Sequence, residues 1–312
     1  MKFKLSAVLV SLLLLTSCSS SNNPTPSSSS PSSEPVATAV PTPFKSVGNL
    51  KVHFIDVGQG DSILVQTPAG KAMLVDAGKK EDGPKIVDYI KSQGIQKLDA
   101  LVYTYPAEEH IGGIVQVASS FTIDNLYLPR KMSDSPIQKE FLKLDNIKNM
   151  DKNEAAPGSK IYIDPDVVID VVAPNDYSNE NIKDYSVVLK LTYGENSFLL
   201  TGDATSVSEK LMLSRKYNLS STVLKVADHG SKDSTSYEFF NAVAPKYAVI
   251  SVGKGNTNGD PSKEVLDKLN TAAVQTYRTD ESGTIVATTD GFTLKFDKGA
   301  AANTSASPAN TN

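Results

Sequence analysis

Acidic and imidazole side chains follow several apolar segments of this chain, and these residue types can bind a metal ion. Side chains at strand ends are held rigidly, and a cation needs ligands whose positions vary by no more than roughly a few tenths of an ångström. The sequence therefore predicts a metal site where several strands end. Its predicted ligands are Glu109, His110, Asp203, Asp228, His229 and Asp260.

Most of these ligands are carboxylates, and hard oxygen ligands favour Mn²⁺, Mg²⁺ or Ca²⁺ over Zn²⁺. If the site binds an ion at all, the sequence thus predicts one divalent cation, with Mn²⁺ preferred over Zn²⁺. A water molecule bound to that ion, with its pKa lowered, would attack a phosphorus or carbonyl centre. The predicted catalytic residues are Glu109, His110 and Asp203, with Lys225 or Lys232 stabilising the negative charge that develops.

The elements that must position these residues can be predicted from hydropathy and turn signals. Predicted strands are residues 50–55, 62–66, 71–75, 98–104, 125–128, 167–172, 186–193, 197–201, 223–226, 247–252 and 273–278, followed by a hairpin at 283–296. Predicted helices are residues 84–93, 137–148, 206–215, 236–243 and 262–269. Strands that first follow one another and then alternate with helices predict two packed sheets with helices outside.

Other polar residues favour structural interpretations. Asp76 also ends a predicted strand, but we do not include it among the predicted ligands. His53 lies on an apolar strand and is predicted to be hydrogen-bonded rather than a ligand. Asp61, with the Gln and Gly before it, is predicted to fix a turn through hydrogen bonds to the backbone. The Lys79–Lys80 pair is predicted to lie in a solvated loop, and residues 279–283 to form a turn.

The N-terminus has the order of an export signal, with lysines, an apolar run and small residues before Cys18. The residues before this cysteine resemble the lipobox of bacterial lipoproteins. Since Cys18 is the only cysteine, we predict a lipoprotein signal peptide at residues 1–17 and lipidation of Cys18. The protein would then be extracytoplasmic and anchored by lipid to a bacterial membrane.

A stretch rich in Ser and Pro follows the cysteine, and its composition cannot bury enough apolar surface to fold. We therefore predict a tether at residues 18–46, one α/β domain at residues 47–298 and a disordered tail at residues 299–312. The net charge is −4, and the chain has no block of Lys and Arg. This balance gives no support to a strongly basic nucleic-acid surface.

Six ordered motifs resemble the metallo-β-lactamase-fold domain at the C-terminus of the DNA-uptake protein ComEC. The motifs are HFIDVGQGDS from His53, LVDAG from Leu74, HIGG from His110, LTGD from Leu200, HGS from His229 and YRTDESGTI from Tyr277. This resemblance spans essentially the whole predicted domain. It implies an α/β fold, a four-layer αββα sandwich, with a two-metal hydrolytic centre that acts on phosphodiester bonds of DNA.

The chain departs from the ComEC-like pattern at several ligand positions. Tyr105 stands where the pattern has its first loop histidine, and Ala107 stands where it has an aspartate. Glu109 replaces a second aspartate, while Asp228 and Asp260 replace histidines. A tyrosine is a poor ligand unless it is ionised, and alanine offers no donor. A normal two-zinc centre is therefore not expected.

Two interpretations of this altered site remain open. In the first, the metal site is degraded, and an atypical member of the metallohydrolase superfamily binds nucleic acid or an unidentified protein partner. In the second, the site is retuned for one harder ion, and the protein is an active Mn²⁺-type phosphodiesterase or nuclease. Fold alone does not decide between them.

Overall fold

The computed structural model describes residues 44–132, 134–178 and 180–299. These residues belong to one compact unit that begins at Phe44. The predicted signal peptide, Cys18, most of the predicted tether and nearly all of the predicted tail lie outside the described residues. The predicted boundary between residues 46 and 47 stays a prediction. In the described part of the chain, no helix combines the length and apolar character needed to cross a bilayer.

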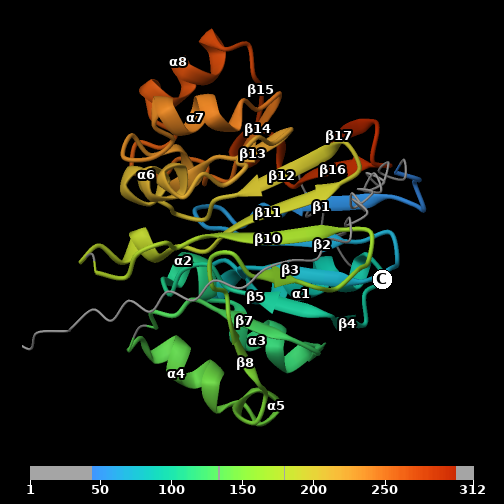
Figure 1. Ribbon diagram of the computed structural model, residues 1–312. Helices are drawn as coiled ribbons and strands as arrows, with labels where there is room; N and C mark the ends of the chain where they lie inside the picture. The colour runs from blue at the N-terminus through green and yellow to red at the C-terminus, as the bar shows by residue number, and fades with distance from the viewer. Residues whose placement is uncertain (1–43, 133, 179, 300–312) are drawn as a thin grey trace, which may run out of the picture. The chain divides into compact units, whose positions relative to one another are not determined.

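Two large sheets form the centre of the described unit (Figure 1). The first has the strand order β17-β16-β1-β2-β3-β5-β7-β8. Its strands are β1 Leu50–Phe54, β2 Ile63–Gln66, β3 Ala72–Val75, β5 Ala100–Val102, β7 Leu126–Leu128, β8 Lys152–Glu154, β16 Ile285–Thr289 and β17 Leu294–Lys298. From β3 to β8 neighbouring strands are parallel, so their carboxyl ends lie at the same edge.

The second sheet has the order β15-β14-β13-β12-β11-β10-β9. Its strands are β9 Lys160–Ile161, β10 Val168–Ala173, β11 Val188–Tyr193, β12 Asn196–Leu200, β13 Val223–Lys225, β14 Tyr247–Ile250 and β15 Gln275–Arg278. The strands from β12 to β15 are parallel. A small separate ladder pairs β4 Lys97–Leu98 with β6 Thr122–Ile123.

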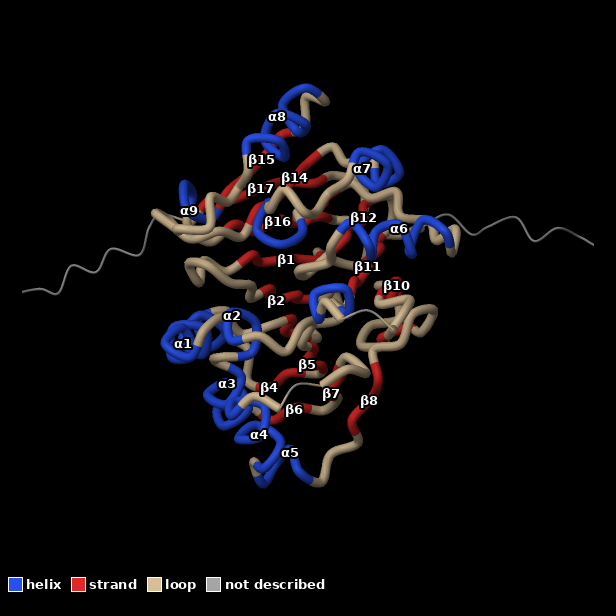
Figure 2. The backbone as a smooth tube through the Cα atoms, turned by 90° about the vertical axis from the view of Figure 1, so that its left-hand side faces the viewer, coloured by secondary structure: helices blue, strands red, loops and turns tan. Residues whose placement is uncertain are grey.

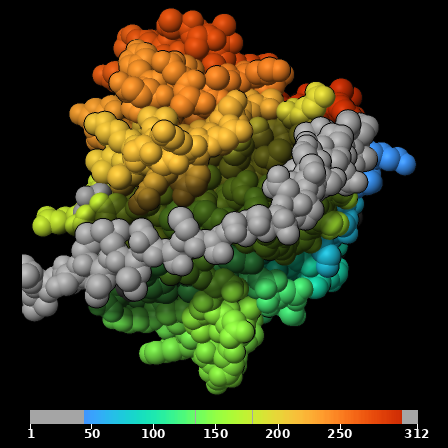
Figure 3. All heavy atoms as spheres, viewed as in Figure 1, coloured from blue at the N-terminus to red at the C-terminus, as the bar shows by residue number. Residues whose placement is uncertain are grey.

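Helices cover both outer faces of the sheet pair, as two views at right angles show (Figures 1 and 2). One group is α1 Gly83–Ser92, α2 Glu108–Ile111, α3 Ile114–Ser120, α4 Pro136–Lys143 and α5 Asp145–Lys148, and the other is α6 Ser206–Ser214, α7 Tyr237–Val243 and α8 Lys263–Thr271. In the space-filling view, the orange residues of the second group lie above and the green residues of the first lie below (Figure 3). Short helices η1 Lys80–Asp82, η2 Ile182–Tyr185, η3 Ala227–Gly230 and α9 Thr279–Ser282 occupy connections.

Strand alternation explains the four layers. In β2, Ile63 and Val65 pack between the two sheets, whereas Leu64 packs toward α1 and α3. In β12, Phe198 points between the sheets, whereas Leu199 packs under α6 to α8. Successive side chains of a strand point to opposite faces, so both sheets are apolar on two sides. The predicted αββα sandwich is therefore confirmed.

The predicted strand at residues 98–104 is divided between β4 and β5, and two further predicted elements differ in detail. The predicted helix at residues 137–148 is split into α4 and α5, because Leu144 has an extended backbone (φ −56°, ψ 139°) while its side chain packs against the apolar core below the first sheet. The predicted turn at 279–283 begins as the one-turn helix α9. Its first residue, Thr279, is buried, and its hydroxyl accepts a hydrogen bond from the backbone N–H of Val252.

His53 of β1 is buried and hydrogen-bonded at both ring nitrogens, which agrees with its predicted structural role. Gln66 Oε1 lies 2.8 Å from Nε2, and the Tyr89 hydroxyl lies 2.8 Å from Nδ1. The amide oxygen can only accept, so Nε2–H donates to Gln66 and Nδ1 accepts from Tyr89. Burial lowers the pKa of His53 from 6.5 to about 4. The ring is thus neutral at physiological pH.

This lowered pKa predicts an acid-sensitive contribution to stability. The unfolded chain binds a proton at His53 near pH 6.5, whereas the folded chain resists it until about pH 4. Stability is therefore present above pH 6.5 and is lost as the pH falls, by about 3 kcal/mol in total. We expect His53→Gln to flatten the pH dependence of the free energy of unfolding, measured by urea denaturation between pH 7 and 4. If the free energy of unfolding of the wild type and of His53→Gln had the same pH dependence, the lowered pKa of His53 would be contradicted.

Candidate metal centre

The polar residues of the site follow the carboxyl ends of parallel strands in both sheets. Asp76 follows β3 and Thr104 follows β5 in the first sheet, while Asp203 follows β12 and His229 follows β13 in the second. His110 lies on the short helix α2 that follows the Thr104 loop. These residues therefore lie close to one another where the ends of the two sheets meet.

Close backbone packing holds the α2 loop against the neighbouring loops. A Cβ atom added to Gly60 would lie 2.5 Å from the carbonyl oxygen of Glu109, and one added to Gly113 would lie 2.4 Å from the carbonyl oxygen of Ala77. The backbone N–H of Asp61 donates to that same Glu109 carbonyl at 3.1 Å. Only glycine permits such contacts, so the two glycine-containing motifs fix the position of His110.

Asp76 orients His110. Its Oδ2 lies 2.8 Å from His110 Nδ1 and accepts a hydrogen bond from the Thr104 hydroxyl at 2.6 Å, while its Oδ1 accepts from the Thr104 backbone N–H at 2.7 Å. Asp76 has a left-handed backbone conformation, with φ at 60°. A carboxylate on one ring nitrogen is the usual way to direct the other toward a metal. The Nε2 atom of His110 accordingly faces Asp203 Oδ1 at 3.2 Å.

His229 presents its Nε2 atom to the same carboxylate oxygen. Its Nδ1–H donates to the backbone oxygen of Ser251 at 2.9 Å, which leaves the Nε2 lone pair free in the neutral ring. Nε2 lies 3.7 Å from Asp203 Oδ1. Both Asp228 and His229 have positive φ angles, 47° and 55°. Such backbone strain is concentrated at functional sites.

The group formed by His110, Asp203 and His229 fits one metal ion. Their ligand atoms lie within 4.8 Å of one another, and all three residues are buried. Asp203 Oδ1 faces both imidazoles, 3.2 Å from His110 Nε2 and 3.7 Å from His229 Nε2. Within the described ranges, His229 Nε2 has no hydrogen-bond partner, and a buried polar atom without a partner costs about 1–3 kcal/mol. The convergence of three buried ligand atoms therefore indicates a position for a cation.

The charges around His110 are balanced when no cation is present. Burial alone would lower the pKa of His110, but the nearby charges of Asp203 and Asp76 raise it well above the usual value. Burial alone would raise the pKa of Asp203, but the charge and hydrogen bonding of His110, with the charges of His229 and Lys225, lower it well below the usual value. A proton on His110 then occupies the role that a cation would take, so ion binding must release it.

The other three predicted ligands lie outside this group. Glu109 is half-buried, and Asp260 is half-buried beside a backbone hydrogen bond to Asn256 Oδ1. Asp228 Oδ1 accepts a hydrogen bond from Lys183 Nζ at 2.6 Å. The group that could share an ion thus contains two imidazoles and one carboxylate, rather than the mostly carboxylate set expected from sequence. Zinc also takes this donor set, so the preference for Mn²⁺ stays a prediction, as do the six ligand assignments.

Sequence reasoning missed three polar contributors. Asp76 follows a strand as the chosen ligands do, and that signal could have identified it. Asp61 was expected to fix a turn, but its side chain accepts from Lys225 Nζ at 2.5 Å, and both residues are buried. Asp61 also forms a second candidate ligand group with Asp76 and His110. Lys183 has no sequence signal, because only the fold brings η2 to the site.

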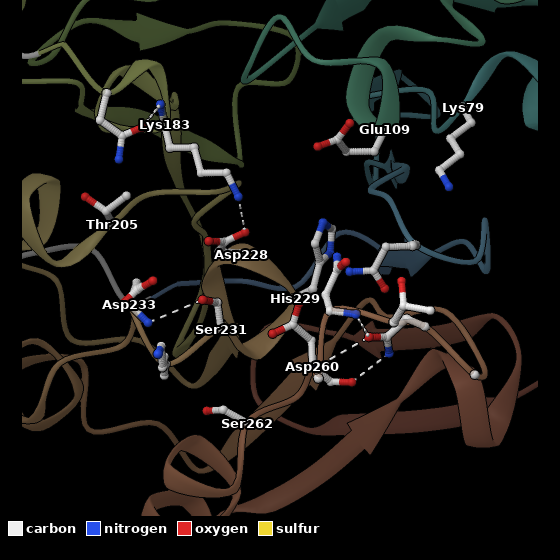
Figure 4. Close-up of a pocket in the computed structure, with 18 residues that line it drawn as sticks. Lys79, Glu109, Lys183, Thr205, Asp228, His229, Ser231, Asp233, Asp260 and Ser262 are labelled. Carbon is white, nitrogen blue, oxygen red and sulfur yellow. Dashed lines mark hydrogen bonds and ion pairs between the residues drawn. The ribbon is translucent and has the colours of Figure 1, made fainter.

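A cavity of about 970 Å³ lies in front of this group (Figure 4). His229 forms part of its wall, whereas His110 and Asp203 are buried and do not line it. Among the described lining residues are three lysines and four carboxylates: Lys79, Lys183, Lys232, Glu109, Asp228, Asp233 and Asp260. The lining therefore contains one more carboxylate than lysine.

Tyr105 is buried beside the site and does not act as an ionised ligand. Its ring stands edge-on to His110, with 5.4 Å between ring centroids. Burial raises the pKa of Tyr105 to about 12, so its hydroxyl remains protonated at neutral pH. This agrees with the sequence interpretation that Tyr105 is a poor ligand.

Comparison with known proteins supports the fold. Residues 55–254 match the family described as the metallo-beta-lactamase superfamily. With its αββα layers and a His and Asp group at the sheet ends, the chain belongs to the metallo-beta-lactamase superfamily.

Within that superfamily, the chain is similar to proteins with competence-related names. It is 31% identical to ComE operon protein 3 of Bacillus subtilis over 75% of this chain and 32% of that protein. It is 30% identical to competence protein ComA of Neisseria gonorrhoeae over 74% of this chain and 31% of that protein. The chain thus spans about a third of the length of these relatives. The predicted resemblance to the ComEC family is confirmed.

A solved structure supports the fold independently. The metallo-beta-lactamase fold protein YhfI from Bacillus subtilis superposes with a TM-score of 0.52, covering 78% of this chain and 100% of that chain. The two sequences are 14% identical. At this level of identity, the likeness concerns the fold alone.

The role of Asp76 in orienting His110 predicts a loss of ion affinity on Asp76→Asn. Asparagine tolerates the left-handed backbone at this position, but it removes the charge that directs the ring. We expect affinity for a divalent cation to fall about 10- to 100-fold, measured by competition with a chelator, with the circular dichroism spectrum unchanged. Asp88→Asn on the exposed side of α1 is the control. Equal affinities of the two variants would exclude the orienting role.

Proposed function

We propose that this protein is a hydrolase of the phosphodiesterase class that works with a single divalent cation. The observation that carries this proposal is the convergence of three buried ligand atoms from His110, Asp203 and His229, which lie within 4.8 Å of one another. A bound divalent cation supplies a Lewis acid and lowers the pKa of a water molecule. The reaction class is proposed from the resemblance to the DNA-uptake protein ComEC, because the fold alone does not determine a reaction.

The chain's own residues would orient the reactants. Asp76 and the Ser251 carbonyl hold the two imidazoles in the tautomers that ligation needs. Glu109 lines the cavity and can accept a proton from an attacking water. Lys183 and Lys232 line the same cavity and can stabilise the charge of a phosphoryl group.

A phosphodiester or nucleic-acid substrate is part of the proposal. Two relatives are named as a ComE operon protein and a competence protein, and this chain matches about a third of each. The cavity wall has more carboxylates than lysines, so a polyanion would bind poorly before a divalent cation offsets the excess. Ion and substrate binding should therefore be coupled. Mn²⁺ suits the lining carboxylates, while Zn²⁺ suits the two imidazoles.

A second candidate function is ion-free binding of nucleic acid or a protein partner by a degraded metal site. Lys183 favours it, since its ammonium lies 2.6 Å from Asp228 Oδ1 and 3.4 Å from Asp203 Oδ2. Together with a protonated His110, this lysine neutralises carboxylates that would otherwise require a metal. The two functions differ in whether any ion stabilises the protein.

The single-cation hydrolase predicts stabilisation by a divalent ion. At an ion concentration 100 times the Kd, the native state gains about 2.7 kcal/mol, which corresponds to a rise in Tm of about 5–10 °C. We expect Mn²⁺ or Zn²⁺ to produce this rise and EDTA to reverse it, with hydrolysis of bis-p-nitrophenyl phosphate following the same ion. Asp203→Asn should lose both effects. If no ion moves the Tm, the single-cation hydrolase is excluded.

We further propose that the protein is extracytoplasmic and attached to a bacterial membrane by lipid on Cys18. The supporting observations are the order of lysines, apolar run and small residues before the single cysteine. A single acyl chain binds a membrane only weakly, whereas several chains on one cysteine anchor it stably. This location would place the catalytic domain outside the cytoplasm on a Ser- and Pro-rich segment.

Lipid attachment predicts that Cys18→Ala releases the protein from membranes. We expect the wild-type protein, expressed in a bacterial host, to sediment with membranes and incorporate radiolabelled palmitate. The variant should do neither, because it lacks the thiol. Ser17→Ala, which keeps the cysteine, is the control. Membrane sedimentation of Cys18→Ala equal to that of the wild type would refute the anchor.

A further inference from the structure

The two oxygens of Asp203 face different positive groups. Oδ1 lies 3.2 Å from His110 Nε2 and 3.7 Å from His229 Nε2. Oδ2 lies 3.4 Å from Lys183 Nζ. A carboxylate that bridges two metal ions offers one oxygen to each. In this protein, one oxygen faces the candidate ion position and the other faces an ammonium group.

Lys183 joins two carboxylates at this second position. Its Nζ lies 2.6 Å from Asp228 Oδ1 as well as 3.4 Å from Asp203 Oδ2, and the pair with Asp228 is visible at the cavity wall (Figure 4). On this side of Asp203, the described residues thus provide two carboxylates and one fixed positive charge.

The fold holds Lys183 more firmly than an ordinary surface lysine. It belongs to η2, where the Asn181 side chain accepts a hydrogen bond from the Lys183 backbone N–H at 3.1 Å. The next residue, Asp184, accepts a hydrogen bond from the Thr205 hydroxyl at the start of α6. Tyr185 is fully buried and stacks on Tyr177 with 5.7 Å between ring centroids. These contacts fix the backbone from which the ammonium extends.

We infer that Lys183 occupies the place of a second cation and thereby restricts the centre to one metal ion. An ammonium supplies the positive charge that Asp203 and Asp228 require, but it cannot act as a Lewis acid. It has three N–H donors; one donates to Asp228 Oδ1 at 2.6 Å, and Asp203 Oδ2 lies 3.4 Å from the same ammonium. A remaining N–H can donate to an anionic phosphoryl oxygen in the cavity, which Lys183 lines with a side chain that is 33% exposed.

The inference about Lys183 rests on the proposed single-cation function for the first ion position, and metal stoichiometry tests the two separately. We expect wild-type protein dialysed against Mn²⁺ or Zn²⁺ to retain one ion per chain, measured by elemental analysis and calorimetric titration. Lys183→Met should retain a second, more weakly bound ion, because two carboxylates lose their cation. Lys183→Arg should retain one.

Lys232→Met is the matched control, since Lys232 is an exposed lysine that lines the same cavity. Two ions in the wild type would overturn the role of Lys183 and leave the metal-dependent function standing. The same stoichiometry and affinity in Lys183→Met and Lys232→Met would also overturn it. No ion in the wild type but one in Lys183→Met would support Lys183 as the substitute cation and refute the single-cation hydrolase. If Lys183→Met does not fold, the wild-type and Lys183→Arg stoichiometries still decide between one ion and two.

Discussion

The contact between His110 and Asp203 is the constraint on which the site depends. Asp203 follows β12 of one sheet, and His110 is fixed through Asp76 after β3 of the other. Neither residue is exposed to solvent, so each charge must be compensated within the protein. A buried charge without a partner costs several kcal/mol. The ends of the two sheets are therefore held together by an electrostatic requirement as well as by the apolar core.

This constraint explains why the altered site has not simply lost its charges. Asp203 remains buried among groups that carry or can carry positive charge, and Asp228 is paired with Lys183. An ion at the imidazole side would replace the proton on His110, while the lysine would remain on the other side. The positive charge at His110 can thus be exchanged for that of an ion, whereas the charge of Lys183 stays in place.

The sequence predicted the layers well because their cause is local. Consecutive apolar residues in β2 and β12 require two covered faces, because successive side chains point to opposite sides of a strand. This pattern is visible without the structure. The strand-exit positions of Asp203 and His229 were likewise readable, since a polar residue directly follows an apolar run. By contrast, the pairs Asp61 with Lys225 and Asp203 with Lys183 join residues far apart in the chain. Nothing in the local sequence specifies such pairs, because they arise only when the two sheets meet.

The enclosed pair of Asp61 and Lys225 has a consequence for how this chain can vary. Both side chains are buried, and their charged atoms are 2.5 Å apart. Replacing only one partner leaves the other charge buried and unpaired, which lowers the free energy of unfolding by about 3–5 kcal/mol. Replacing both by apolar groups is often nearly neutral for stability. Substitutions in the turn after β1 and at the end of β13 should therefore be correlated. Among descendants of this sequence, the two positions should change in concert or stay as they are.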